Sequence, residues 1–382
     1  MNKNEIVLLE LIKKSLFGAE VTFEEDTDWD EVQKEAIAQT VTALTSPAVP
    51  KPQTEKWSVF AAQSLSHYMR TIYEQTNLVK LLNDNNIPFV ILKGTAAAVY
   101  YNNPSLRTMG DIDFIVEPKN YDFVIELLRG NGYVQEEDPN CVRHTTFYKG
   151  NVDFELHKQY SHDAFNIDSL VLSGMKNRVI REINGHSFPT LPDSENGLVL
   201  LEHIHHHISY GGVGIRQLID WAMFSNRVLD DKYYKESFLP LIKSVGLERF
   251  CENITKTCKM YLGLPDTFTW CDGADNKAAT DIIELVMQNG NFGVKHYGET
   301  ESSAKGFVFA VKKDGLMRTL QGFGCENFAI CRKYRFFHAF AWLFQIFRYI
   351  RKGLVALFSG KILIKDINEG KEKADFYKRL GL

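Results

Sequence analysis

The chain has 382 residues, of which 45% are hydrophobic and 24% are charged, with a formal net charge of −4. These values are ordinary for a globular protein, and the length gives room for two or three domains. No segment contains 18 or more uncharged apolar residues, so no membrane-spanning helix is predicted. The charge is uneven, since residues 301–382 carry 16 Lys and Arg against 7 Asp and Glu, and residues 1–300 carry 28 against 41.

The six cysteines form neither a CxxC pair nor a zinc-finger spacing. Nothing in their arrangement suggests a disulfide framework, so reduced thiols in a cytoplasmic compartment are expected. Charges interrupt the first apolar run, at residues 8–14, which predicts an amphipathic helix and not a secretory signal.

Residues 1–87 are predicted to form an N-terminal helical region. Asp28 is placed to cap a helix that continues to Leu44, the prolines of residues 47–52 break it, and a long helix follows over residues 55–83. Apolar side chains recur at helical spacing along the long helix and predict its buried face. They are Trp57, Phe60, Leu65, Met69, Ile72 and Val79.

Residues 88–192 alternate between short strands and helices. The expected strands cover residues 89–92, 111–116, 133–136, 145–149, 152–156, 178–183 and 187–190, and Gly150-Asn151 is typical of a hairpin turn. Short helices are expected over residues 96–100 and 121–128. The pattern predicts an α+β fold with a small mixed-sheet core, flanked by N-terminal and C-terminal helical regions.

The remaining chain is predicted to be helical. A helical domain over residues 193–300 contains periodic segments at 198–208, 215–227, 239–261 and 278–287. Residues 301–382 form a basic, aromatic helical tail. Within it, residues 336–347 are uncharged and include six aromatic residues, with basic residues on both sides.

Two carboxylates one residue apart, Asp111 and Asp113, stand in an otherwise apolar strand. Side chains alternate along a strand, so both acids point the same way, about 6.5–7 Å apart. Two acids on one face repel each other unless a cation lies between them. Hard divalent cations such as Mg²⁺ prefer carboxylate and phosphate oxygens, so the pair predicts a metal site.

A later strand offers further ligands. Asp153, Glu155 and His157 share one of its faces by the same alternation, while the apolar residues between them take the other. This face is interpreted either as the source of a third carboxylate or as an ordinary solvated hairpin face.

The segments Ile91-Leu92-Lys93-Gly94, Tyr100-Tyr101, Pro104, Leu106-Arg107 and Met109–Asp113 resemble an uncharacterised bacterial nucleotidyltransferase family of the DNA polymerase β-like superfamily. The resemblance runs from roughly residue 50 to residue 290. Thr95 stands where the superfamily usually has Ser or Gly, and the 15-residue gap from this turn to Asp111 is longer than common.

The resemblance implies a two-metal enzyme that uses Mg²⁺ or Mn²⁺. It would move a nucleoside monophosphate, AMP from ATP, onto a hydroxyl of an acceptor that the sequence does not identify, with release of pyrophosphate. The catalytic and metal-binding residues implied are Asp111, Asp113 and Glu155, with Asp153 as the alternative third ligand. The nucleotide-binding residues implied are Gly94, Thr95, Arg107 and Lys93, although either basic residue could equally be a surface residue.

The resemblance includes a histidine-rich helix followed by a helix with Arg and Asp, which would contact the base or the acceptor. The candidates are His203, Arg216 and Asp220 on these helices and His157 on the later strand. Arg216 and Asp220 are four residues apart, which places them on one face of the same helix. A purely structural Arg216–Asp220 pair that holds two helices together is an equal alternative.

Two further function classes remain open. One is a nucleotide-binding protein without turnover, which would use the same pocket. The other is a membrane-surface adaptor that works through a basic helix at residues 332–358, giving peripheral membrane contact, although packing of this segment against the protein is the simpler reading. No aromatic-plus-basic RNA motif occurs, so nucleic acid ranks last among the partners.

Overall fold

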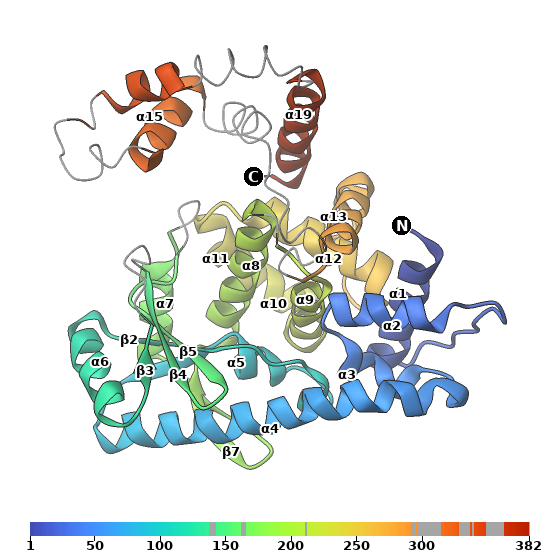
Figure 1. The fold of residues 1–382 in the computed structure, drawn as a ribbon, viewed down its shortest axis with the longest axis horizontal. Coiled ribbons are helices and arrows are strands. Elements are labelled where there is room, and N and C mark those ends of the chain that lie inside the picture. The colour runs from blue at the N-terminus through green and yellow to red at the C-terminus, as the bar shows by residue number, and fades with distance from the viewer. Residues whose placement is uncertain are drawn as a thin grey trace. The chain divides into compact units, whose positions relative to one another are not determined.

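A computed structural model describes residues 1–136, 143–161, 166–210, 212–291, 295, 315–327, 337, 340–348 and 363–381. The chain divides into two compact units, Met1–Tyr297 and Gly298–Leu382 (Figure 1). The boundaries expected from the sequence at residues 87, 192 and 300 stay predictions.

The first unit begins with four helices, α1 (Lys3–Phe17), α2 (Trp29–Ala38), α3 (Thr42–Thr45) and α4 (Thr54–Asp84). The single helix expected to reach Leu44 is therefore wrong. The left-handed backbone of Thr40, with φ 56°, ends α2 and starts a new direction. Short 3₁₀ turns, Ser46–Ala48 and Lys51–Gln53, then carry the proline-rich segment into α4.

The expected buried face of α4 is only half correct. Trp57, Ile72 and Val79 are buried, but Leu65 and Met69 are 44% and 63% exposed. The 31 residues of α4 cross from the helices α1–α3 to the sheet (Figure 1), so different stretches of the helix face different neighbours.

Seven strands form one mixed sheet in the order β3-β4-β5-β2-β1-β7-β6. Central strand β2 pairs in parallel with β5 and antiparallel with β1, and β1 pairs in parallel with β7. The sheet confirms the expected α+β class. The strands are β1 (Phe89–Leu92), β2 (Ile112–Val116), β3 (Val134–Gln135), β4 (His144–Lys149), β5 (Val152–His157), β6 (Val179–Ile183) and β7 (His186–Thr190).

The two faces of the sheet differ in chemistry. One face buries alternate residues of β2 and β5, among them Phe114 and Phe154, in a core shared with α4 and with α6 (Tyr121–Gly130). The intervening residues point to the opposite face by the period of two. The candidate site lies on that opposite face.

The remaining helices of the unit lie between the strands or after them in the chain. They are α7 (Asp168–Lys176), α8 (Asp193–Tyr210), α9 (Ile215–Val228), α10 (Asp231–Tyr233), α11 (Leu239–Ser244), α12 (Glu248–Leu262) and α13 (Asn276–Asn289), and a five-residue helix, α5 (Gly94–Ala98), follows β1. The single helix expected over residues 239–261 is wrong, because Gly246 takes φ 76° and separates α11 from α12. Two 3₁₀ turns, Pro104–Leu106 and Pro118–Asn120, and a π-helical turn, Tyr234–Phe238, complete the unit.

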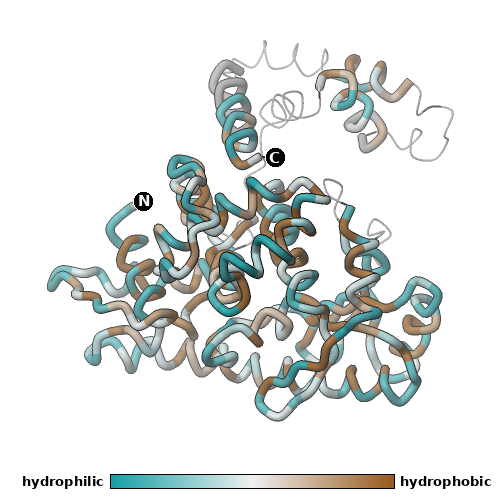
Figure 2. The backbone as a smooth tube through the Cα atoms, turned by 180° about the vertical axis from the view of Figure 1, so that it is seen from behind, coloured by the Kyte–Doolittle hydropathy of each residue, from teal (hydrophilic) through white to brown (hydrophobic). Residues whose placement is uncertain are grey.

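The helices of the first unit alternate between hydrophilic and hydrophobic stretches along their length (Figure 2), as helices with one buried face do. Among the described residues, none of the helices combines the length and the apolar composition that a bilayer crossing requires. The described cysteines, Cys251, Cys258, Cys271 and Cys325, carry free thiols. The cytoplasmic location stays a prediction.

The second unit is described in part, with α15 (Leu316–Asn327), a helical segment at residues 341–348 and α19 (Leu363–Leu380). Most of the basic segment expected at residues 332–358 lies outside the described residues. Its described part exposes Phe340, Leu343 and Phe347 to 43%, 37% and 69%.

Candidate functional site

A cavity of about 200 Å³ opens on the polar face of the sheet, where β2 and β5 meet α8 and α9. Acidic residues from the strands and basic residues or histidines from the surrounding elements line it together. The lining residues are Lys93, Gly94, Arg107, Gly110, Asp111, Asp113, Arg143, His144, Glu155, His157, His203, His206, His207 and Arg216.

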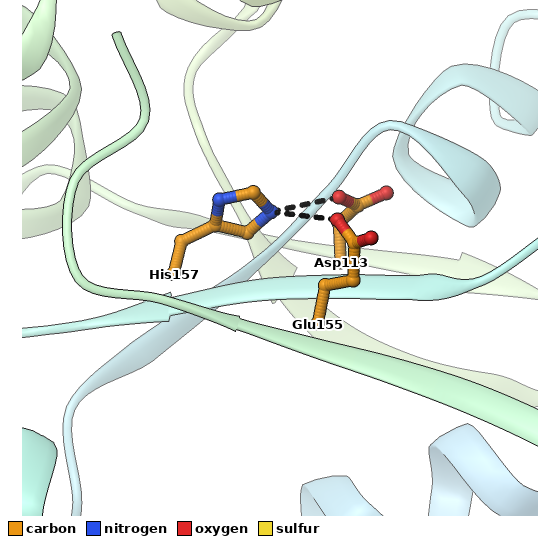
Figure 3. Close-up of side chains that lie close together, drawn as sticks. All are labelled: Asp113, Glu155 and His157. Carbon is orange, nitrogen blue, oxygen red and sulfur yellow. Dashed lines mark hydrogen bonds and ion pairs between the residues drawn. The ribbon is translucent and has the colours of Figure 1, made fainter. Parts of the chain in front are cut away.

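Three of the side chains that line this cavity converge (Figure 3). The parallel register places Asp113 beside Glu155, and His157 lies two residues further along β5. His157 Nε2 is 2.8 Å from Asp113 Oδ1 and 3.5 Å from Glu155 Oε2. One potential ligand atom from each residue lies within 4.8 Å of the others. The alternation within each strand and the pairing of β2 with β5 thus bring the acids together.

The charges in this cluster are strongly coupled. Burial raises the pKa of Glu155 to about 9, and the neighbouring Asp113 carboxylate adds to the shift. The pKa of Asp111 is also raised, first by Asp113 and then by burial. Burial opposes ionisation of Asp113 as well, but Lys93 and His157 outweigh it and hold the pKa of Asp113 below its usual range. Asp113 therefore carries the fixed negative charge of the site.

These donors fit a divalent cation. Two carboxylates and one imidazole are within reach of a single ion, and carboxylate oxygens suit Mg²⁺ and Mn²⁺. His157 Nε2 donates a hydrogen bond to the ionised Asp113, so this nitrogen can bind an ion only after losing its proton. With the proton retained, His157 orients Asp113.

Of the four nucleotide-binding residues expected from the sequence, three line the cavity and one does not. Lys93 and Gly94 line the cavity, and Lys93 Nζ donates to Asp113 Oδ1 at 2.8 Å. Thr95 is buried outside the cavity lining, and its hydroxyl donates to Gln75 at 2.7 Å. Arg107 does line the cavity, but its Nε and Nη2 each donate to Asp220 at 2.7 Å.

Two further acids expected at the site, Asp111 and Asp153, differ in whether they line the cavity. Asp111 lines the cavity, at the end of the loop that enters β2, although it lies outside the tight Asp113–Glu155–His157 cluster. Asp153, the alternative third ligand, is exposed at the start of β5 and does not line the cavity.

Helices α8 and α9 supply the opposite wall. His203 lines the cavity, and burial, with His207 nearby, lowers its pKa well below the usual range, so its imidazole is neutral. Arg216 Nη1 donates to the Thr108 carbonyl oxygen at 3.1 Å, on the loop that leads to Asp111. Asp220 does not line the cavity and bonds Arg107 instead of Arg216.

Sequence reasoning missed five lining residues, Gly110, Arg143, His144, His206 and His207. A signal existed for His144. The Gly150-Asn151 turn fixes the register of β4 on β5, and counting back from it pairs His144 with His157. The His203-to-His207 spacing likewise places both rings on one face of α8, where their centroids lie 4.4 Å apart.

The chain matches a protein family and is similar to several solved structures. The family described as uncharacterised nucleotidyltransferase matches residues 25–263. A nucleotidyltransferase-like antigenic protein from Paracoccidioides brasiliensis is similar at 14% identity and a TM-score of 0.32, over 52% of this chain and 94% of that one. No curated protein matches the chain.

The family match covers well over half of the chain and includes β1, β2, β5 and the cavity residues of α8 and α9. This protein therefore belongs to the uncharacterised nucleotidyltransferase family.

Proposed function

We propose that this protein is a divalent-metal-dependent nucleotidyltransferase of the DNA polymerase β-like superfamily. It would transfer a nucleoside monophosphate, AMP from ATP, onto a hydroxyl of an acceptor and release pyrophosphate. One observation carries the proposal: Asp113 and Glu155 lie side by side on neighbouring parallel strands, in a cavity that also holds Asp111 and several cationic side chains.

The reaction exchanges one P–O bond for another. The acceptor oxygen bonds to the α-phosphorus, and the bond from that phosphorus to the pyrophosphate oxygen breaks. Mg²⁺ or Mn²⁺ held by Asp111, Asp113 and Glu155 would supply charge neutralisation at the phosphate oxygens. We assign the acceptor's hydroxyl proton to Glu155, because its carboxylate lines the cavity beside Asp113.

The position of the cations supports a division of roles around the triphosphate. Lys93 and Arg216 face the cavity beside the acids, and we place these two against the phosphates. Gly94 leaves the wall beside them without a side chain. Arg107 and Asp220 instead hold the loop before Asp111, because Arg107 Nη1 also donates to the Thr108 carbonyl oxygen at 3.3 Å.

The acceptor would enter along α8. His203, His206 and His207 give this wall imidazoles, which can donate to or accept from hydroxyl groups. This chemistry suits a sugar, another small hydroxyl-bearing molecule or a protein side chain.

The proposal is tested by pyrophosphate release from each of the four ribonucleoside triphosphates with Mg²⁺. Asp113→Asn and Glu155→Gln should each reduce the rate by more than about a hundredfold, since even residues that only orient metal ligands contribute 10–100-fold. Asp153→Asn is the matched control and should act like the wild type, because Asp153 is exposed outside the cavity.

Retained release by Asp113→Asn would refute the catalytic role of the cavity. A wild type that binds ATP but releases no pyrophosphate would identify the alternative, a nucleotide-binding protein without turnover. Contact of residues 332–358 with a membrane surface also stays a prediction, which the exposed Phe340 and Phe347 favour.

A further inference from the structure

Lys93 stands at an unusual point of the backbone. It directly follows β1, whose last residue, Leu92, pairs with Asp113 across the antiparallel register. Alternation would send the next side chain to the opposite face of the sheet. Lys93 instead has φ 47° and ψ −130°, a positive-φ conformation that costs a non-glycine residue about 1–3 kcal/mol.

The consequence of this backbone is a buried ammonium in the acidic cluster. Lys93 Nζ lies 2.8 Å from Asp113 Oδ1, the same oxygen that accepts from His157, and its side chain is only 13% exposed. The ring of Tyr160 closes over it, with Nζ 5.4 Å from the ring centroid. An aromatic face favours a cation, so the pocket is built to hold this ammonium in place.

We infer that Lys93 is a resident counter-ion, which occupies the cation position of the acidic cluster and leaves it for the triphosphate when the nucleotide enters. This inference rests on the proposed function, because it assigns a nucleotide to the cavity. A divalent ion within reach of Asp113, Glu155 and His157 would lie close to the ammonium that Lys93 places on the Asp113 carboxylate, and the two cations would repel each other. Metal and Lys93 therefore compete, and the phosphates resolve the competition by attracting Lys93.

The inference makes metal binding depend on nucleotide. Without nucleotide, the divalent ion must displace the ammonium and leave it buried without its carboxylate. With nucleotide, Lys93 has a new anionic partner close by. Because such coupling is reciprocal, the metal should strengthen nucleotide binding by the factor by which the nucleotide strengthens metal binding.

The test is the affinity for Mn²⁺ of the full chain without nucleotide, measured by the electron paramagnetic resonance signal of free Mn²⁺. Lys93→Met removes the ammonium and should bind Mn²⁺ at least tenfold more tightly than the wild type. A non-hydrolysable ATP analogue should then add less further affinity than it adds in the wild type. Lys93→Arg keeps the cation and should retain weak binding without nucleotide.

Lys158→Met is the matched control for lost positive charge. Lys158 is exposed and adjoins the end of β5, but it does not line the cavity. It should leave Mn²⁺ affinity within about twofold of the wild type, because an exposed charge is screened by salt. Lys93→Gln, with folding checked by circular dichroism, repeats the comparison with a polar side chain.

Equal or weaker Mn²⁺ binding by folded Lys93→Met and Lys93→Gln would overturn the inference. So would a similar gain in Lys158→Met, which would mean a general effect of net charge. Failure of the proposed function looks different: the wild type would release no pyrophosphate, whereas the Mn²⁺ comparison would still show whether Lys93 holds the cation position.

Discussion

A buried ion pair between Arg107 and Asp220 provides the sharpest test of how the cavity is held together. The two residues are 113 positions apart in the sequence, and both side chains are 5% exposed. Arg107 donates twice to the Asp220 carboxylate at 2.7 Å, and the Tyr101 hydroxyl donates a third hydrogen bond at 2.7 Å. We predict that Asp220→Asn, which removes the charge and keeps the shape, destabilises the fold strongly.

The size of the effect follows from the geometry. Two unit charges about 4 Å apart at an effective dielectric constant of about 20 interact by about 4 kcal/mol. Part of this is retained by the hydrogen bonds that asparagine still accepts, so the free energy of unfolding should fall by about 3–4 kcal/mol. Urea unfolding should show a lower midpoint with an unchanged slope.

A double variant separates the pair from the position. Replacing Arg107 with Met together with Asp220 with Leu removes both buried charges, and it should recover most of the stability lost in Asp220→Asn, because no uncompensated guanidinium remains. A loss below about 1 kcal/mol in Asp220→Asn, or a double variant no more stable than the single one, would refute this reasoning. Either result would return Arg107 to the group of side chains available for phosphate.

Two further predictions concern packing and pH. In Gly197→Ala the new Cβ would lie 2.3 Å from Phe224 Cζ, so the free energy of unfolding measured with urea should fall by about 1–3 kcal/mol. The control is Gly130→Ala, whose Cβ meets nothing within 4 Å and which should be neutral or slightly stabilising. Equal effects of the two substitutions would contradict the packing of α8 on α9. Burial and a neighbouring carboxylate raise the pKa of Glu155 to about 9, and a metal needs the ionised form. Mn²⁺ affinity should therefore rise about tenfold per pH unit between pH 7 and pH 8, and Glu155→Gln should reduce this slope. A titration without such a rise would remove Glu155 from the ligand set.

The sequence predicts the sheet and its acids because their signals are local. Alternation puts Asp113 and Glu155 on the polar faces of their strands, and the turn at residues 150–151 sets the hairpin. These features depend on neighbours within a few residues, and the period of two survives folding.

The rest of the site depends on contacts between distant residues, which alternation does not encode. The sequence predicts Thr95 as a phosphate contact, but in the structure its hydroxyl donates a hydrogen bond to Gln75, 20 residues earlier. The sequence predicts Arg107 as a phosphate contact too, but its guanidinium donates to Asp220 of α9. The sequence predicts Lys93 near phosphate, but its positive-φ backbone and its bond to Asp113 arise only from the assembled turn.

Helix α4 has a consequence for the integrity of this protein. Its first half contacts α3 and the turns before it, with Trp57 fully buried, and its second half contributes Tyr68, Ile72 and Leu82 to the core under the sheet. The single helix α4 therefore packs both on the elements that precede it and on the sheet. A truncated protein beginning at residue 88 would lose the helix that covers one face of the sheet. A protein that contained the strands without this helix would expose the apolar face of the sheet to solvent.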